Sequence, residues 1–514
     1  MESMIASNGE LPLMFELQPT EEPRTVIKNM ETVRIRRVNR EQTWVVYIDV
    51  ERLIPENHPA RAIWELVGQL DLSAFLAKKL AMGDQPGRPN ISPQLLISLW
   101  LYAYSWGTGS AREISELCGY HPAFQWLTGM KKVNYKSISD FRTQHGTALE
   151  KLFVQVLAVM DEENLIDLDL VTQDGTKIRA WASSDTYRRE KTLKQRLEQA
   201  EKLVEESQKE GFDKDKTVRQ IKAQKRAREE RVGRMKAAIA ELEKVREGMS
   251  NGEPEDARVS HTDPEARIMK GSSSGYQSSY NIQLTTDAKH KVIVAVDTTN
   301  CASDAGELNP GLKQTQDNLG RAPRKVVIDA GYTTYANVVG MERGSIVLYA
   351  SLPSTAARDQ RRREAQEVVI YGPNRFDFQP ENKCAVCPEG KKLKYLGRIG
   401  KDQERYQAAE SDCGTCSQKV ACCGNKKSKL IEINVGYHAM ARMKQKMETE
   451  EGQAIYRKRG AVAEFPNAWF KAKFNFRQTC LRGLEKVRMD ARWHAIAYNV
   501  AQWSRLCWRP RFAT

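Results

Sequence analysis

Two aspartates that follow short apolar runs are the residues best placed to do chemistry. Asp329 closes the run Val326–Ile328 in the segment RKVVIDAGY (324–332), and Asp174 lies in LIDLDLVTQDGTKIRAWAS (165–183). A short β-branched run predicts a buried strand, and open α/β sheets carry their chemistry at the carboxyl ends of strands. Taken alone, Asp329 is more often explained as an aspartate that closes a turn. Converging carboxylates instead predict a site for a hard divalent cation.

A third acid, Glu464, lies in the segment IYRKRGAVAEFPNAWFKAKFNFRQ (455–478), which we expect to be helical with Pro466 in a first turn. Glu464 and Lys471 are seven residues apart, which places them two turns apart on one helix face. The alternative is an amphipathic helix whose aromatic residues pack in the core. Cations and aromatic residues that interleave here suit phosphate contact and base stacking: Lys471, Lys473, Arg477, Trp469, Phe470, Phe474 and Phe476.

The elements that position the aspartates follow from hydrophobic patterning. Asp174 alternates with Leu168, Leu170 and Thr172 on one strand face, and Gly175 predicts a turn or bulge beside the acid. Residues 280–285 and 292–297 predict a β-hairpin, 304–319 a helix, and 344–352 a further strand. Apart from one long insertion, this is the element order of an α/β, ribonuclease-H-like core. In that topology the strands of Asp174 and Asp329 are neighbours.

Cysteines cluster in a loop-rich stretch as two CxxC pairs. Cys384 and Cys387 form one pair, and Cys413 and Cys416, 25 residues further on, form the other. Four thiolates predict a closed structural zinc site, in which Cys422 or Cys423 is an alternative ligand. Unligated thiols are the other explanation, because the spacing between the pairs exceeds the usual 15–20 residues. A redox role is less favoured, since no thioredoxin-like pattern surrounds either pair.

Charge and hydropathy bound the class of protein. The 514 residues carry 80 Lys and Arg against 66 Asp and Glu, a net charge of +14. This balance favours a polyanionic partner such as nucleic acid, although basic surfaces without such a role are common. The longest apolar stretch, Leu95–Trp106, is too short to span a membrane, and the N-terminus lacks the features of a signal peptide. We therefore expect a cytoplasmic protein.

The first third of the chain predicts short helices joined by tight glycine turns, an arrangement that resembles a helix-turn-helix. Ser110 is expected to begin a helix in a capping box with Glu113. The alternative to DNA contact is an ordinary helical bundle with exposed cations. The cations available to phosphates are Arg112, Lys131, Lys132, Lys136 and Arg142.

Composition divides the chain into several units. We expect a flexible leader at 1–45, a helical DNA-binding domain at 46–165, and a catalytic core at 166–185, 276–352 and 437–478. A charged helical hairpin, broken near Gly211–Asp215, is expected as an insertion at 186–262. A cysteine-rich insertion is expected at 353–436, and an amphipathic helix that covers the sheet at 479–514.

At this level of detail the chain resembles the DDE transposases of bacterial insertion sequences, most closely the IS1182-type group within the IS4/IS5-like superfamily. The resemblance extends from about Tyr47 to Leu506. It is carried by several motifs in order: GRP (87–89), SAREISELC (110–118), SISDFR (137–142), TQDGTKI (172–178), DPEARIMK (263–270), YNIQL (280–284), VVIDAGY (326–332), the cysteine-bearing insertion, and Tyr456 to Lys471.

The resemblance implies a catalytic triad of Asp174, Asp329 and Glu464 that binds two Mg²⁺ ions, with Mn²⁺ as a substitute and Asp174 as the bridging ligand. The family's final motif is Tyr-x2-Arg-x3-Glu-x6-Lys. Tyr456, Arg459, Glu464 and Lys471 match it, except that four residues instead of three separate Arg459 from Glu464.

The resemblance also implies the reaction and its partner. Water first cuts the DNA at the transposon end, and the freed 3′-hydroxyl then attacks target DNA, with no covalent link to the protein. Two ends are joined, which implies a homodimer. The alternatives are a non-catalytic DNA-binding protein and a nuclease without joining activity. The residues implied to contact DNA are Lys471, Tyr456, Arg459, Arg112, Lys136 and Arg142.

Overall fold

The structure is a computed structural model that describes residues 40–41, 43, 45–76, 90–209, 217–249, 253–271, 275–352, 371–379 and 381–512. Two units are distinguished, Met1–Ile48 and Asp49–Thr514. The described residues of the first unit are exposed. Most of the predicted leader and the GRP motif at 87–89 lie outside the described residues. Within those residues, no helix has the length and apolarity needed to cross a membrane.

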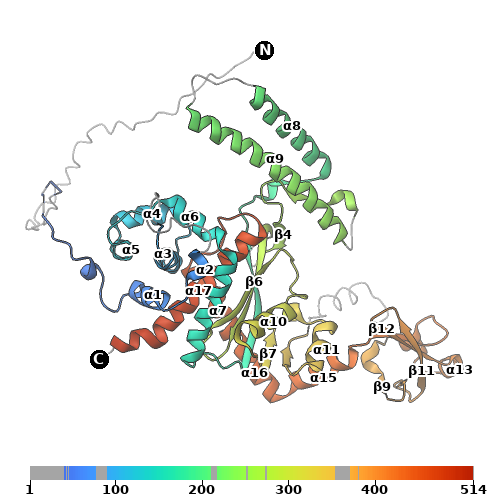
Figure 1. Cartoon of the computed structure of the whole chain (residues 1–514). Helices are drawn as coiled ribbons and strands as arrows, with labels where there is room; N and C mark the ends of the chain where they lie inside the picture. The colour runs from blue at the N-terminus through green and yellow to red at the C-terminus, as the bar shows by residue number, and fades with distance from the viewer. Residues whose placement is uncertain are drawn as a thin grey trace, which may run out of the picture. The chain divides into compact units, whose positions relative to one another are not determined.

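A mixed six-stranded sheet forms the centre of the second unit (Figure 1). Its strands are β1 Leu170–Arg179, β4 Arg267–Lys270, β5 Tyr276–Asp287, β6 Ile293–Thr299, β7 Lys325–Ile328 and β8 Val347–Ala350. β1 pairs antiparallel with β5 and parallel with β7, which in turn runs parallel to β8. Both β4 and β6 pair with the edge of β5 opposite β1. The predicted hairpin is confirmed as β5–β6, and the strands of the two aspartates are neighbours as expected.

The turn or bulge predicted at Gly175 is wrong. β1 continues through Gly175 in unbroken register with β5 as far as Arg179. The reason for glycine is space: a Cβ atom at Gly175 would lie 2.6 Å from Asp304 Oδ1 and 2.7 Å from Gln283 Nε2. Glycine therefore allows polar side chains from neighbouring segments to approach the backbone beside Asp174.

Helix α17, Leu484–Trp503, contacts the sheet at β6 and also two N-terminal helices, α3 and α7. Every residue from Met489 to Val500 is buried, so the prediction of an amphipathic helix with one solvent face is wrong. Two of its buried polar residues have partners: Tyr104 donates to Asp490 at 2.6 Å, and Arg492 pairs with Glu150 at 3.0 Å. A helix that buries all of its faces belongs to the core.

The N-terminal helices share one hydrophobic core with the sheet and α17. Ser110 accepts a hydrogen bond from the Glu113 amide, as predicted for the start of α4. The reciprocal half of the capping box is not formed, because the Glu113 carboxylate accepts from Thr108 instead. The helices are α1 Pro59–Gly68, α2 Ser73–Leu76, α3 Pro93–Ser105, α4 Ala111–Tyr120, α5 Pro122–Thr128, α6 Tyr135–Gln144 and α7 Gly146–Glu162.

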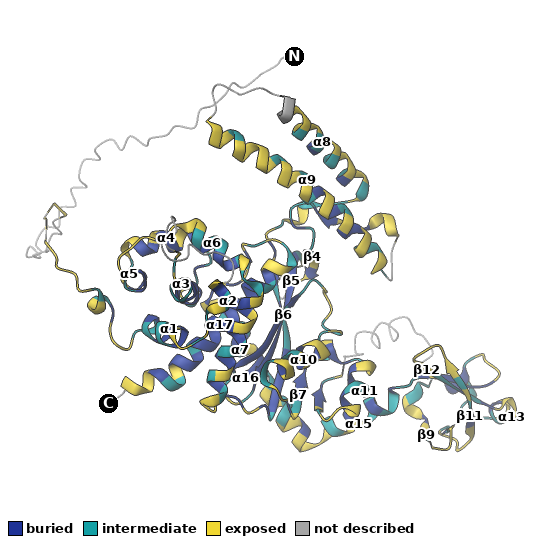
Figure 2. Ribbon diagram, viewed as in Figure 1, coloured by how far each residue is buried: buried dark blue, intermediate teal, exposed yellow. Residues whose placement is uncertain are grey.

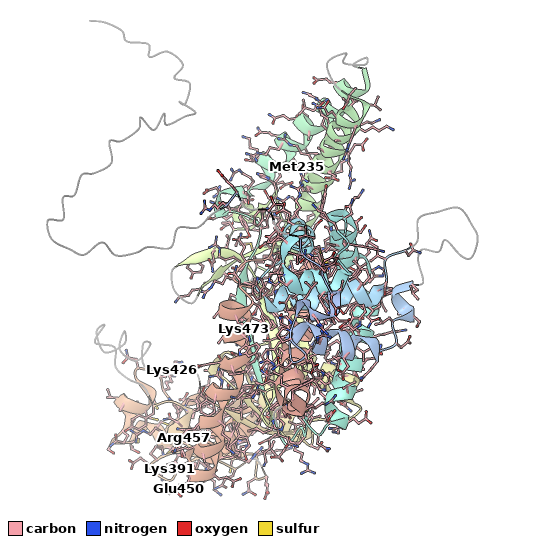
Figure 3. The ribbon with its side chains drawn as sticks, turned by 90° about the vertical axis from the view of Figure 1, so that its left-hand side faces the viewer. Met235, Lys391, Lys426, Glu450, Arg457 and Lys473 are labelled. Carbon is pink, nitrogen blue, oxygen red and sulfur yellow. The ribbon has the colours of Figure 1, made fainter. Side chains whose placement is uncertain are left out.

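The charged insertion is a pair of helices, α8 Glu190–Lys209 and α9 Val218–Glu247, followed by the short strand β3 Val259–Ser260, which pairs with β2 Tyr187–Arg188. Leu193, Met235 and Leu242 form a small apolar cluster between the helices (Figure 3 labels Met235). Most of the remaining helix surface is exposed (Figure 2). The predicted break near Gly211–Asp215 lies outside the described residues.

The cysteine-rich stretch forms a five-stranded antiparallel sheet with its own apolar cluster. Its strands are β9 Asp377–Gln379, β10 Cys384–Val386, β11 Lys392–Ile399, β12 Gln403–Ala408 and β13 Leu430–Asn434, and two short helices, α13 Glu410–Gly414 and α14 Lys419–Cys423, precede β13. The chain then returns to the large sheet through α15 Tyr437–Glu448 and α16 Glu450–Ala468. Between β6 and β8 the connecting helices are α10 Leu308–Leu319 and α11 Tyr335–Arg343.

Candidate active site

Asp174 and Asp329 meet at the carboxyl end of β7. Asp174 lies within β1, and Asp329 follows β7 directly and caps the 3₁₀ turn Ala330–Tyr332 by accepting from the Gly331 amide at 2.8 Å. Arg459 of α16 reaches both carboxylates: its Nη2 atom lies 3.4 Å from Asp174 Oδ1 and 3.6 Å from Asp329 Oδ2. Two neighbouring parallel strands and one helix therefore bring the two predicted aspartates to the same guanidinium group, that of Arg459.

Asp174 is an enclosed carboxylate, with 17% of its side chain exposed. Its Oδ2 atom accepts from Asn467 Nδ2 at 2.7 Å. Burial raises the pKa of Asp174 to about 6, and the negative charges of Asp329 and Asp304 add to this effect, while Arg459 opposes it. The site therefore holds a carboxylate whose charge is only partly compensated, which is the electrostatic condition that favours cation binding.

Glu464 does not join the two aspartates in this structure. Its side chain is exposed, and its Oε1 atom lies 3.8 Å from the place that a Cβ atom on Gly460 would occupy, one turn back on its own helix. Across the part of the chain that the structure describes, no group of three or more His, Cys, Asp or Glu side chains is arranged to hold a metal ion. The helix of Glu464 instead contributes Arg459 and Asn467 to the aspartate pair.

Lys471 lies within the electrostatic influence of Asp174, although its local structure differs from the prediction. Helix α16 begins after the cap residue Thr449, so Pro466 lies in its last turn and not in a first turn. A π-helical turn, Trp469–Lys473, follows directly. Proline removes a backbone donor and disturbs the helix ladder, which accounts for a change of helix type near this position. Burial lowers the pKa of Lys471, while the charge of Asp174 acts in the opposite direction.

Two family models match the chain. Residues 386–504 match the model described as a transposase DDE domain, and residues 48–144 match the model described as a transposase domain, DUF772. Both matched segments are thus described as transposase domains. This pairing of models is typical of the IS1182 family. The DDE match includes Glu464 and Lys471 but neither Asp174 nor Asp329. No curated protein matches this chain.

Sequence reasoning missed two polar residues at the aspartate pair. Asn467 donates to Asp174, and Asp304, in the loop between β6 and α10, accepts from Lys177 of β1 at 3.2 Å. One indication of such a polar face was available. Asn281 and Gln283 alternate with apolar residues in YNIQL, so that two amides share one face of a buried strand.

The predicted DNA contacts of the N-terminal helices differ in accessibility. Arg112 lies over the ring of Tyr135, 5.3 Å from its centroid, and Lys136 is exposed on α6. The predicted DNA contact of Arg142 does not fit its position in the structure. Only 6% of Arg142 is exposed, and its Nη1 atom donates to the Gly109 carbonyl at 2.8 Å. Its buried position arises because the guanidinium packs over Trp100, 4.5 Å from the ring centroid. Arg142 therefore stabilises the helical core instead of facing a phosphate.

Tyr456 and the neighbouring basic residues of α16 have different surroundings. Tyr456 packs partly buried against the cluster of Leu170, Val327 and Tyr349. Arg457, the next residue, is exposed, as is Lys473, the last residue of the π-helical turn (Figure 3 labels both). The ring of Tyr456 thus helps to hold α16 against the sheet.

The cysteines in the cysteine-rich stretch are grouped differently from the two predicted pairs. Cys387, Cys413, Cys416, Cys422 and Cys423 line one small enclosed cavity. Cys423 hydrogen-bonds with both Cys413 and Cys422. Cys384 does not line this cavity, and its thiol donates to Gln379 Oε1 at 3.7 Å. The donor chemistry suits zinc, but the four thiols predicted as ligands are not gathered as one set.

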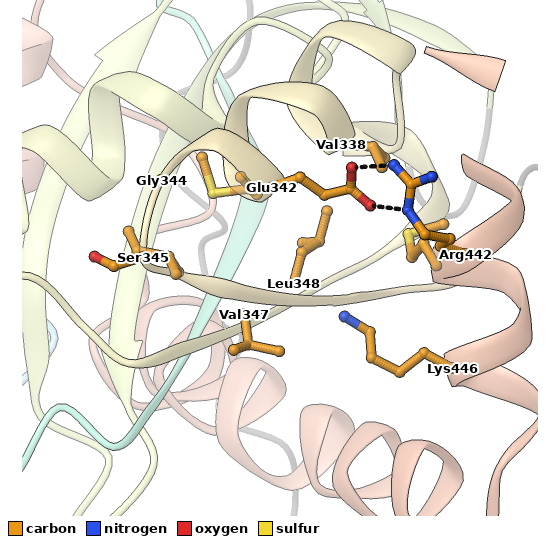
Figure 4. A pocket seen from close by; sticks show the side chains of 11 residues that line it. Val338, Glu342, Gly344, Ser345, Val347, Leu348, Arg442 and Lys446 are labelled. Carbon is orange, nitrogen blue, oxygen red and sulfur yellow. Dashed lines mark hydrogen bonds and ion pairs between the residues drawn. The ribbon is translucent and has the colours of Figure 1, made fainter. Parts of the chain in front are cut away.

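A separate pocket of about 300 Å³ lies between α11, the start of β8 and α15. Glu342 and Arg442 form a two-point ion pair at its rim, with distances of 3.1 and 2.7 Å (Figure 4). Because β8 runs parallel to β7, the start of β8 lies at the opposite end of the strands from Asp329. This pocket is therefore not part of the aspartate site.

Proposed function

We propose that this transposase binds the ends of its insertion sequence and catalyses divalent-metal-dependent DNA strand cleavage and strand transfer. The observation that carries the proposal is the convergence of Asp174 and Asp329 on one cationic group, Arg459 Nη2. The strand order β6–β5–β1–β7–β8, in which β5 alone runs antiparallel to the other four strands, supports a ribonuclease-H-like assignment of the core.

The residues at the pair fit a hard divalent cation. Carboxylate and amide oxygens are the ligands that Mg²⁺ and Mn²⁺ prefer. Within the described residues, Asn467 Oδ1 is buried without a hydrogen-bond partner. The guanidinium group of Arg459 already lies between the two carboxylates. The negative charge of the two carboxylates is therefore partly neutralised by a positive group in this structure. When bound there, divalent cations activate the attacking oxygen and stabilise the leaving oxygen of a phosphodiester.

The chain's own side chains then have separate tasks. Asp174 and Asp329 would hold the cations, and Glu464 would complete the set when DNA is bound. With cations held by the two carboxylates, Arg459 would turn toward the phosphate. Burial lowers the pKa of Lys471, and the charge of Asp174 acts to raise it. In this proposal the ammonium group of Lys471 neutralises the phosphate beside the scissile bond. Water attacks first and the new 3′-hydroxyl second, so that no side chain acts as a covalent nucleophile.

The partner in this proposal is double-stranded DNA, both as transposon end and as target. The net charge of +14 suits a polyanion. Arg112 and Lys136 are the proposed phosphate contacts of the N-terminal helices. A homodimer is proposed because two ends must be joined in one reaction.

The test is an Asp329→Asn variant assayed on labelled DNA that carries the element's end. The variant should lose strand cleavage by at least a hundredfold and retain end binding within about threefold of wild type, since a proposed metal ligand is removed while the DNA-contacting cations remain. Asp317→Asn is the matched control, because Asp317 pairs with Lys313 on the exposed face of α10. Full cleavage by Asp329→Asn with Mg²⁺ would remove Asp329 from the site.

The exposed position of Glu464 favours one second candidate, a non-catalytic DNA-binding protein derived from a transposase. The same assay separates the two functions. End binding by wild type without any cleavage in Mg²⁺ or Mn²⁺ would support that candidate, and cleavage without joined products would indicate a nuclease.

A further inference from the structure

Two adjoining cavities lie where β1 ends. The larger, of about 430 Å³, is bordered by residues 179–184, which end and follow β1, and by β5. The smaller, of about 300 Å³, is bordered by the same end of β1, by residues 474–478 and by α17. Arg179, Trp181 and Gln478 line both cavities. We call the two cavities together the β1 groove, with these three side chains in its shared wall.

Hydrogen-bonded backbone forms the floor of the β1 groove. The Arg179 amide donates to the Arg477 carbonyl at 3.0 Å, and the Thr479 amide donates back to the Arg179 carbonyl at 2.9 Å. Gln478 Nε2 donates to the Ala180 carbonyl at 3.2 Å. The segment after the π-helical turn is therefore fixed against β1 before any ligand arrives, and a site of this kind loses little entropy on binding.

The β1 groove carries positive charge that the protein does not neutralise. Arg179, Arg477 and Arg482 line it and are exposed, and none of the three forms an ion pair with a described residue. Among the described residues that line the groove, the only acid is Asp490, which is buried and accepts hydrogen bonds from two neighbouring hydroxyls. Arginine forks without a carboxylate partner suit the phosphates of a nucleic acid.

Trp181 gives the β1 groove an aromatic surface. Its side chain is 47% exposed, and it contacts no aromatic ring or cation among the described residues. Bases of a nucleic-acid strand stack on exposed aromatic rings while cations hold the strand's phosphates. Polar side chains in the larger cavity can hydrogen-bond with the edge of a stacked base: Ser183, Ser184 and Gln277. Aromatic and cationic groups together therefore favour nucleic acid over an acidic protein surface.

The β1 groove adjoins the aspartate pair. Burial lowers the pKa of Lys471, the charge of Asp174 raises it, and the charges of Arg477 and Lys177 lower it further, so these groups are neighbours. Arg179 follows Asp174 by five residues of β1, which is ~17 Å of strand, or the rise of about five nucleotides of a B-form DNA strand.

We propose that the β1 groove binds an unpaired stretch of the DNA strand beside the cut. Arg179 and Arg482 hold its phosphates, and one base stacks on Trp181. A base that is still paired and stacked within the duplex does not present its face to an indole ring, so the nucleotide bound here is unpaired. This inference rests on the proposed function, since the strand is one that is cut at the aspartate pair.

The experiment compares two labelled DNA probes by fluorescence anisotropy with the full chain in EDTA. One probe is the duplex end of the element, and the other carries an added single-stranded extension of about six nucleotides at the cut, placed on each strand in turn. Wild type should bind one of the extended probes about tenfold more tightly than the duplex, since stacking of one base contributes about 1–3 kcal/mol. Trp181→Ala should abolish this preference and bind the duplex within about twofold of wild type, whereas Trp181→Phe should keep most of the preference.

The arginines are tested by salt dependence. Arg482→Ala should reduce the slope of log affinity against log salt for the extended probe by about 0.7, the value for one phosphate of a single strand. Arg321→Ala is the matched control, because the Arg321 guanidinium already donates to both carboxylate oxygens of Asp161, and its slope should equal that of wild type. An unchanged slope in Arg482→Ala would remove Arg482 from the site.

Several outcomes would overturn the proposal. Equal binding of the probes by wild type, or an unchanged preference in Trp181→Ala, would refute the β1 groove alone if wild type still cuts the duplex end in Mg²⁺. Failure of wild type to bind or cut any probe would refute the proposed function as well. A changed oligomeric state in Trp181→Ala, with unaltered DNA affinity, would assign the groove to a protein partner.

A measurement on the unmodified protein avoids any effect of the variants on folding. The extension is made with 5-iodouracil, which crosslinks to a stacked aromatic side chain under ultraviolet light. Mass spectrometry should find the nucleotide on Trp181, in the tryptic peptide of residues 180–188. Crosslinks confined to other peptides would overturn the proposal.

Discussion

Replacing the enclosed carboxylate Asp174 with Asn should stabilise the cation-free protein at neutral and alkaline pH. Burial raises the pKa of Asp174 from 3.8 to about 6. Such a shift corresponds to about 3 kcal/mol of unfavourable free energy for the ionised form relative to the unfolded chain. The folded state binds the proton more tightly, so the contribution of Asp174 to stability is fully present below pH 3.8 and is lost as the pH rises through 6. Asn resembles the protonated acid and avoids this loss.

The assay is urea denaturation followed by tryptophan fluorescence, with EDTA present, at pH values from 4 to 8. The Asn variant should exceed wild type by about 3 kcal/mol near pH 8, and the difference should vanish toward pH 4. Adding Mn²⁺ at a hundred times its Kd should stabilise wild type by about 2.7 kcal/mol and the variant much less. Asp161→Asn is the control of opposite sign, because hydrogen bonding with Arg321 lowers the pKa of Asp161. This account of the site would be refuted if Asp174→Asn were less stable than wild type at pH 8. It would also be refuted if the difference in free energy of unfolding between variant and wild type were the same at pH 4 and pH 8.

Other predictions concern the N-terminal helices and the thiol cavity. Lys136→Ala should weaken DNA binding and reduce the slope of log affinity against log salt by about 1. Arg142→Ala should leave that slope unchanged and lower the melting temperature of the protein. Filter binding over a series of salt concentrations measures the first effect, and thermal melts measure the second. For the cysteines, elemental analysis of freshly purified protein should find about one zinc per chain. Cys422→Ser should lose it while Cys384→Ser keeps it, and equal zinc content in both variants would return Cys384 to the ligand set.

Local patterning in the sequence predicts the aspartate pair well. β7 is a short apolar run that ends at an acid, and the β5–β6 hairpin has clear alternation, so both strands and Asp329 follow from short-range order. Their adjacency follows from element order alone. The position of Asp304 beside the pair was not predicted, because it depends on three donors from β1 and β5, which are more than 20 residues away. Contacts with residues so far away in the sequence produce no recognisable pattern in the residues around Asp304.

Helix α17 shows a different limit of sequence patterning. Asp490, Arg492 and His494 interrupt its apolar residues, and such interruptions usually mark a solvent face. Here each polar group is buried with a partner, and burial lowers the pKa of His494 to about 4, so the imidazole is neutral at pH 7. The periodic pattern of a helix shows which of its residues are polar. It does not show whether a second layer of helices supplies hydrogen-bond or ion-pair partners for those residues. The sheet-covering role was therefore foreseen, and the contact with α3 and α7 was not.

The position of Glu464 follows from one extra residue in the family's final motif. Successive residues of an α-helix are about 100° apart, so a residue four after Arg459 lies about 40° from it and a residue five after lies about 140° away. Arg459 and Asn467 define the face of α16 that meets Asp174, and the position at about 40° is the buried Ala463. Glu464, one residue further, is rotated out of this face.

This rotation predicts a separation between cation binding and catalysis. Glu464→Gln should leave the Mn²⁺ affinity of the DNA-free protein within about twofold of wild type, because the exposed carboxylate makes no contact with the aspartate pair. The same variant should lose most strand cleavage, since Glu464 is proposed to join the site only when DNA reshapes the π-helical turn after α16. Titration by electron paramagnetic resonance and cleavage of labelled ends measure the two effects. A tenfold loss of Mn²⁺ affinity without DNA would mean that α16 already turns Glu464 inward in solution, so that Glu464 binds the cation before DNA does.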